Sequence, residues 1–126
     1  TLFRSVEVQL QAFRLDNGGG LGIAHAFQFA SPDNRAATGP LERFIGLMQT
    51  PAYRPLLQPA STEVRESVLL EDDIAAVPVI IDDTEDQRFF YVFYLRRQGP
   101  GDFEGYWMTE AVRIEGLDAG EPTDAI

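Results

Sequence analysis

Hydrophobic residues follow a helical period in the first part of the chain and a strand period in the second. Up to about residue 50, apolar residues recur three or four positions apart, as on the buried face of a helix. From about residue 60 to 114, runs of β-branched and aromatic residues alternate with turn-forming residues, which is typical of strands. Helices that precede strands in this way predict an α+β fold, in which the helices pack on one face of an antiparallel sheet.

Three helices are expected in the N-terminal part, separated by a run of glycines at residues 18–20 and a polar loop at residues 33–38. Glycine disfavours a helix interior, so the glycine run is predicted to be a hinge between the first two helices. The apolar faces of the three predicted helices consist of Phe3, Val6, Leu10 and Phe13; of Leu21, Ala24 and Phe27; and of Leu41, Phe44, Ile45 and Met48.

About four strands are expected in the second part, as an antiparallel meander with short turns. They are predicted at residues 62–70, 74–81, 88–97 and 106–114. Pro78 has no backbone N–H to donate, so we expect it at a sheet edge or a bulge. Residues 1–114 are predicted to form a single α+β domain, and residues 115–126 an acidic C-terminal tail.

The two strands predicted at residues 74–81 and 88–97 are apolar on both faces. An antiparallel sheet with one face in water should alternate apolar with polar residues, and large exposed apolar patches are rare on monomers. The pattern therefore predicts that the second face meets a protein partner, either another copy or a different subunit. The alternative is that sheet curvature and the tail cover this face. The candidate interface residues are Ile74, Ile80, Phe90, Val92 and Tyr94.

Composition narrows the classes of function. The chain has 126 residues, of which 44% are hydrophobic, as expected for one globular domain. The chain has ten arginines, no lysines and 20 acidic residues, and the resulting net charge of −10 disfavours binding to nucleic acid. The absence of cysteine excludes disulfides and thiolate chemistry, and no apolar run approaches the roughly 20 residues of a membrane span. A first residue other than Met predicts a processed or trimmed chain.

The chain carries no residue pattern that predicts catalysis, a metal site or a cofactor. His25 is the only histidine and lacks an orienting partner, so we expect it to be partly exposed. Asp16 is expected to cap a helix rather than to act as a pocket acid. Residues 82–86 resemble a calcium loop only in composition, because Gln87 replaces the expected glycine, and a solvated turn is expected.

Several short motifs resemble, in order, those of a known family. They are residues 8–14 followed by Asp16-Asn17, residues 26–32 (Ala-Phe-Gln-Phe-Ala-Ser-Pro), Arg43-Phe44, Tyr53-Arg54-Pro55, and residues 93–97 with the later Trp107. The chain thereby resembles, over about residues 6–116, the bacterial and plastid family catalogued as domain of unknown function 4864, which is similar to the nuclear-transport-factor-2-like superfamily. One departure is at residues 107–111, where this chain reads Trp-Met-Thr-Glu-Ala and the family often has Trp-x-Ile-x-Gly.

The resemblance implies a cone, in which helices pack into a strongly bent sheet, with an internal pocket and frequent dimers through the outer sheet face. The apolar second sheet face and the lack of a catalytic set favour a non-catalytic interaction module, an accessory subunit or scaffold, and the resemblance adds a plastid photosynthetic complex as one setting. The alternative is a small apolar-ligand binder, and a third option is a cyclase- or isomerase-type enzyme that uses Asp16 or His25. A plastid location after removal of a transit peptide, or the bacterial cytoplasm, would fit this resemblance. The candidate wall of the ligand pocket is Phe13, Phe27, Phe44 and Tyr91.

Overall fold

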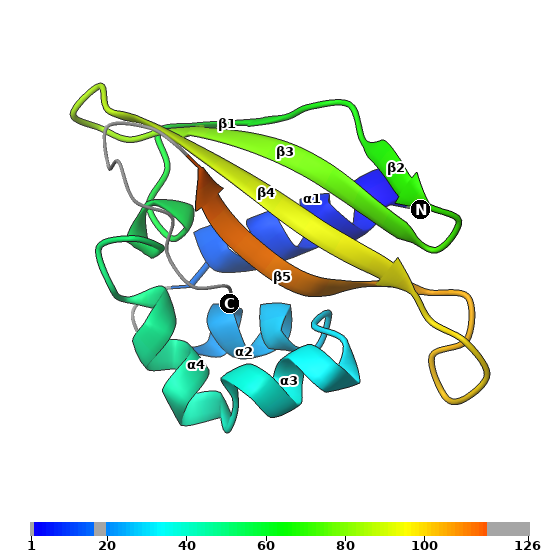
Figure 1. The fold of residues 1–126 in the computed structure, drawn as a ribbon. Coiled ribbons are helices and arrows are strands. Elements are labelled where there is room, and N and C mark those ends of the chain that lie inside the picture. Colours follow the sequence, from blue (N-terminus) through cyan, green and yellow to red (C-terminus); the bar gives the residue numbers. More distant parts are fainter. Residues whose placement is uncertain (1, 17–19, 116–126) are drawn as a thin grey trace.

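The computed structural model describes residues 2–16 and 20–115 (Figure 1). Within these residues the fold is α+β, as predicted, with the helices before the sheet. The helices are α1 (Leu2–Arg14), α2 (Leu21–Phe27), α3 (Pro32–Thr38) and α4 (Leu41–Met48), followed by the 3₁₀ helix η1 (Arg54–Leu56). The strands are β1 (Ser61–Val64), β2 (Val68–Glu71), β3 (Ile74–Asp82), β4 (Arg88–Arg97) and β5 (Trp107–Glu115).

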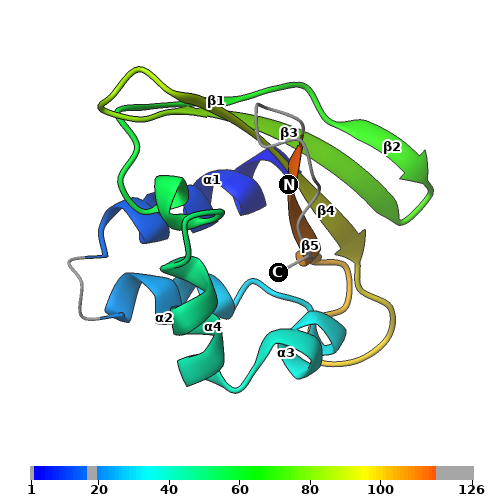
Figure 2. The ribbon, with the colours of Figure 1, turned by 60° about the vertical axis from the view of Figure 1, so that its left-hand side comes forward.

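The sheet is antiparallel in the order β1-β3-β4-β5, and β2 pairs with β3 on the same side as β1. Strands β3 and β4 pair over their whole lengths, from Ile74 opposite Arg96 to Asp82 opposite Arg88. Figure 2 shows the sheet curving over α1, with α2 and α4 on the far side of α1 from the sheet. The curved sheet and the helices therefore enclose one core between them.

Residues 32–38 form α3, so the predicted polar loop is wrong and the described part has four α-helices rather than three. The hydroxyl of Ser31 accepts a hydrogen bond from the backbone N–H of Asn34 at 3.1 Å, and Pro32 occupies the first helical position. A serine cap followed by proline favours a helix start even where apolar residues are few. The Ser31-Pro32 cap therefore indicates this helix, whereas the polar composition of the segment wrongly indicated a loop.

The strand predicted at residues 62–70 is two strands, β1 and β2, and Pro78 explains the interruption. Pro78 lies in the central strand β3, which corrects the expectation of a sheet edge. Its carbonyl accepts a hydrogen bond from Arg65 N at 2.9 Å, but a proline has no N–H to return to that neighbour. The pairing with β3 is therefore interrupted after Arg65, and it resumes at Val68 opposite Ala76.

The core lies between the inner sheet face and the helices. Val6, Leu10 and Phe13 of α1 are buried, as the helical period predicts. In α2 the buried residues are Ile23 and Ala26, and Leu21 is 79% exposed, so the predicted face of this helix is wrong. The buried residues of the inner sheet face are Ala75, Val77, Val79, Ile81, Tyr91, Phe93, Leu95, Val112 and Ile114.

Two predicted features fall largely outside the described residues. Of the glycine hinge at residues 18–20, only Gly20 is described, and it precedes α2 with a φ of 88°. The tail is described only at its first residue, Glu115, so its extent and the domain boundary stay predictions. None of the helices in the described ranges has the length and apolar character needed to cross a bilayer.

Candidate functional site

The strongest functional candidate is the outer face of the sheet, which points away from the helices. Burial alternates along β3, so that Ala75, Val77, Val79 and Ile81 are buried while the residues between them are half-exposed. All five candidate interface residues have the outward parity of β3 or β4. Four of them, Ile74, Ile80, Val92 and Tyr94, are half-buried, and Phe90 is 39% exposed.

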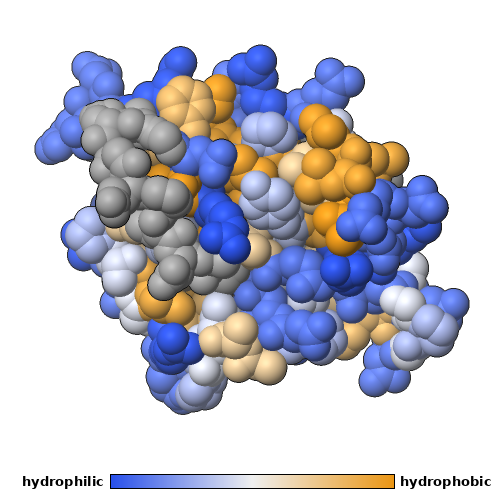
Figure 3. Space-filling model, in the orientation of Figure 1, coloured by the Kyte–Doolittle hydropathy of each residue, from blue (hydrophilic) through white to orange (hydrophobic). Residues whose placement is uncertain are grey.

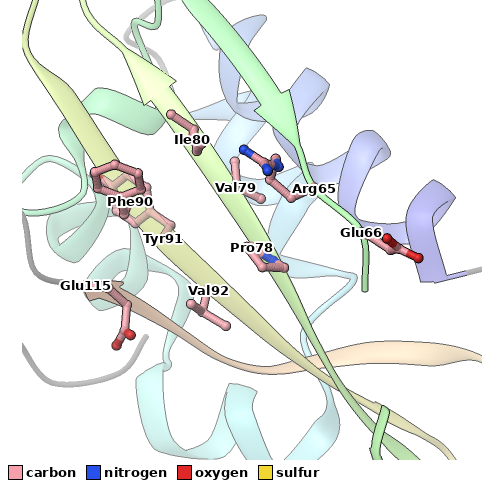
Figure 4. Close-up of a pocket in the computed structure, with 9 residues that line it drawn as sticks. All are labelled: Arg65, Glu66, Pro78, Val79, Ile80, Phe90, Tyr91, Val92 and Glu115. Atoms are coloured by element: carbon pink, nitrogen blue, oxygen red, sulfur yellow. The ribbon is translucent and has the colours of Figure 1, made fainter. Parts of the chain in front are cut away.

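Cross-strand pairing gathers these apolar residues into a strip. Ile80 lies opposite Phe90, and Pro78 lies opposite Val92. Around them lies a shallow hollow of about 700 Å³, here called the outer-face groove (Figure 4). Arg65 and Glu66, in the link between β1 and β2, border the groove on one side, and Glu115 of β5 borders it on the other. The groove is thus apolar along its centre and charged at both rims.

Apolar surface continues onto β2, where Val68, Leu69 and Leu70 are 55%, 63% and 54% exposed. In the described ranges β2 pairs with β3 alone, so its other side is an open sheet edge. Figure 3 shows hydrophobic surface over β2 and over the upper part of β3 and β4, with polar surface around it. Exposed apolar surface next to an open edge is typical of a place where another chain docks.

Charged residues of both signs surround the strip. Arg88 donates two hydrogen bonds to Asp82, at 2.8 and 3.1 Å, and this partner lowers the pKa of the Asp82 carboxyl. Arg96 donates to Glu110 at 3.1 Å and to Asp73 at 3.3 Å. Exposed pairs of this kind contribute little to stability, and they influence mainly which charged surfaces can approach this face.

The interior between helices and sheet is filled with side chains. The rings of Phe27 and Phe44 lie 4.8 Å apart, and the Tyr91 hydroxyl donates to Ala52 O at 2.7 Å. The space beside Phe13 and Phe44 measures about 10 Å³, which is the room of roughly one water molecule. Phe13, Phe44 and Tyr91 are buried in the core cluster and Phe27 packs against it, and their role as a ligand-pocket wall stays a prediction.

Of the two candidates for acid–base chemistry, Asp16 has a structural role and His25 lies at the surface. Asp16 caps α2, because its Oδ1 accepts from Gly22 N at 2.7 Å and from Ile23 N at 3.1 Å, which confirms the cap prediction. His25 is exposed, as predicted, and its ring lies 5.8 Å from that of Phe29.

The acidic turn at residues 82–86 is held together from within. Asp83 Oδ1 accepts the backbone N–H groups of Glu85 and Gln87, at 2.8 and 2.9 Å. Across the described residues, no group of three or more His, Asp, Glu or Cys side chains is placed to hold a metal ion.

The sequence analysis did not predict a second pocket, which lies at the loop between β4 and β5. Aromatic residues from this loop and from the end of α2 surround Arg35 there. The available signal was the density of aromatic residues at positions 103–107, which the glycine and proline of the loop concealed.

The described residues define an α+β domain with a core on the inner face of the sheet and an apolar strip on its outer face. The chain belongs to the family described as Domain of unknown function (DUF4864), whose family model matches residues 1–119. This finding confirms the family resemblance of the motifs. No curated protein and no solved structure matches the chain.

Proposed function

We propose that this protein is a non-catalytic interaction module that forms a homodimer through its outer sheet face. The observation that carries the proposal is the apolar strip of Ile80, Phe90 and Val92 on a sheet whose inner face is already packed. The helices occupy the other side of the sheet, so nothing on them competes for this strip (Figure 2). Contiguous apolar surface of this kind marks association sites, and association needs no reactive group.

A second copy suits this face because its apolar strip runs along the centre and its rims carry charged residues. Arg65 lies on the β1–β2 rim, and Glu115 lies on the β5 rim across the outer-face groove. Two copies related by a two-fold axis parallel to the strands place the β1–β2 rim of one over the β5 rim of the other. The apolar strips of the two copies then face each other, and every contact occurs twice, as an isologous interface requires. Phe90 and Val92 lie near the centre, where an apolar anchor contributes most.

The test is the mass in solution, measured by light scattering and by sedimentation equilibrium. The unchanged chain is expected to be a dimer, and Phe90→Arg a monomer, because the substitution buries an unpaired charge at the centre of the interface. Leu21→Arg is the matched control, because Leu21 is also apolar and exposed but lies on α2. A strict monomer at high protein concentration, or a dimer that Phe90→Arg leaves intact, would contradict the proposal.

The other readings of the fold receive less support. A ligand binder in the interior has a space of about 10 Å³, and an enzyme that uses Asp16 would need a carboxyl that already caps α2. We also propose membership of the nuclear-transport-factor-2-like superfamily, which is supported by helices that precede a curved sheet. The plastid location and the photosynthetic complex stay predictions from the family resemblance.

A further inference from the structure

A second pocket, here called the hairpin pocket, lies at the opposite end of β4 and β5 from the outer-face groove. It has a volume of about 570 Å³, which is within the range of ordinary small-molecule sites. It shares no lining residue with the outer-face groove, so variants at one of the two sites leave the lining of the other unchanged. Its lining residues are Ser5, Gln28, Phe29, Arg35, Phe103, Gly105, Tyr106, Trp107 and Met108.

Backbone pairing presents the aromatic walls of this pocket. In the β4–β5 loop, Gly105 N donates to Gln98 O at 2.9 Å, and Gln98 N donates to Tyr106 O at 2.9 Å. Gly105 makes this turn with a φ of 84°, which favours glycine. On the other wall, Thr109 N donates to Phe29 O at 2.8 Å and holds Phe29 beside the start of β5. The pocket is therefore built from hydrogen-bonded backbone on both sides.

Arg35 is the only charged residue among those that line the pocket. Its guanidinium lies 5.6 Å from the centroid of the Phe103 ring, a cation–π geometry. Its Nε is buried without a hydrogen-bond partner, and Arg35 forms no ion pair with any residue in the described ranges. This is unusual in a chain with 20 acidic residues and ten basic ones. A buried donor without an acceptor is unfavourable, so an occupant that supplies an acceptor gains affinity from it.

We propose that the hairpin pocket binds a small-molecule carboxylate with an aromatic or branched aliphatic body. The carboxylate would accept hydrogen bonds from the planar guanidinium of Arg35, after a small movement of the Phe103 ring, and the body would lie between Phe29, Tyr106 and Trp107. A single cation matches a single negative charge. Phosphates and nucleotides carry more charge, so the net charge of −10 repels them more strongly. Arg97, whose guanidinium lies 5.7 Å from the centroid of the Trp107 ring, is not among the residues that line the pocket.

Trp107 provides a readout specific to this site, because it is the only tryptophan of the chain and lines the pocket. The probes are 3-phenylpropanoate and its neutral counterpart 3-phenylpropan-1-ol, titrated while Trp107 fluorescence is recorded. The carboxylate is expected to give a saturable change with an affinity at least about tenfold higher than that of the alcohol. In nitrogen-15 NMR spectra, the Arg35 Nε–H signal is expected to shift with the carboxylate and to stay in place with the alcohol.

Two variants separate the charged contact from the apolar walls. Arg35→Met is expected to abolish the preference for the carboxylate, whereas Arg54→Met, with the same loss of charge on η1, is expected to keep it. Phe103→Ala is expected to weaken both probes equally, because it removes part of the wall. Absence of binding by either probe, equal affinity for both, or a preference that survives Arg35→Met would overturn the proposal.

Discussion

Gln9 Nε2 donates a hydrogen bond to Thr109 Oγ1 at 2.7 Å, and this contact joins α1 to β5 across 100 residues of chain. Both residues are almost completely buried, at 3% and 1% exposure. Thr109 O also accepts from Ser31 N at 2.8 Å and from Asn34 Nδ2 at 3.1 Å. Thr109 of β5 thus connects α1 and the N-terminal end of α3 to the sheet through hydrogen bonds.

Gln9→Leu is expected to lower the free energy of unfolding by about 1–3 kcal/mol, because it takes this partner from the buried Thr109 hydroxyl. Thr109→Val is expected to lower it by less, because Gln9 Nε2 still donates to Ser5 O at 3.3 Å. The double variant is expected to be more stable than the sum of the two losses predicts, since both polar partners are then gone. Urea unfolding followed by circular dichroism measures all three. Strictly additive losses would show that the two side chains do not act as a pair.

The two helical glycines Gly22 and Gly46 are expected to respond oppositely to alanine. A Cβ at Gly22 would collide with the backbone oxygen of Ala12 and lie 2.8 Å from Asp16 N, where α1 and α2 cross. A Cβ at Gly46 would meet nothing within 4 Å, so alanine there gains helix propensity of roughly 0.5–1 kcal/mol. Thermal unfolding should show a lower midpoint for Gly22→Ala and a higher one for Gly46→Ala. A tolerated Gly22→Ala would indicate that α1 and α2 can separate without loss of packing.

The sequence predicted the elements whose periodicity is long. The apolar runs of β3 and β4, which have nine and ten residues, predicted strands. Their two apolar faces indicated the candidate residues on the outer face. In α1 the spacing of Val6, Leu10 and Phe13 identified the buried face. These predictions depended on local pattern alone, which the fold then preserved.

Short elements and sites built from distant segments were beyond the same reasoning. The seven residues of α2 give two turns, so a shift of two positions between Leu21 and Ile23 reverses the buried face. The hairpin pocket requires that Arg35 and Phe103 meet across 68 positions of sequence, and no periodicity encodes that contact. The break between β1 and β2 follows from the missing N–H of Pro78 on the side of β3 that faces these two strands. The arrangement of the sheet determines which neighbour lies on that side, and the sequence of a single strand does not reveal it.

Phe44→Ala is expected to create a cavity in the filled interior. Phe44 is 3% exposed and packs against Phe27, so its truncation should lower stability by about 3–5 kcal/mol. Benzene is then expected to raise the unfolding temperature of the variant and to leave that of the unchanged protein where it is. The milder Phe44→Leu serves if the alanine variant does not fold. A benzene effect on the unchanged protein would show that the interior already has room for an apolar ligand.

Tyr91 is expected to make the protein sensitive to alkaline pH. Burial raises the pKa of the Tyr91 phenol well above its ordinary value of 10.0, with a smaller contribution from Tyr53. Above pH 10 the unfolded chain loses this proton and the folded protein keeps it, so the unfolded state binds fewer protons and stability falls as pH rises. The slope from this group reaches about 1.4 kcal/mol per pH unit, and it is absent below the unfolded pKa.

Tyr91→Phe is expected to lose roughly 1 kcal/mol at neutral pH, because the hydrogen bond to Ala52 O at 2.7 Å is gone, and to flatten the alkaline decline. Tyr106→Phe is the control, because it removes the same hydroxyl group from a tyrosine that is 65% exposed. Urea midpoints measured from neutral pH to above pH 10 compare the three proteins. An alkaline decline equally steep in Tyr91→Phe would assign the effect to another group. If the fall in stability at high pH is smaller in Tyr91→Phe, the Tyr91 hydroxyl of the unchanged protein stays protonated on the inner face of β4, opposite the outer face that carries Phe90 and Val92.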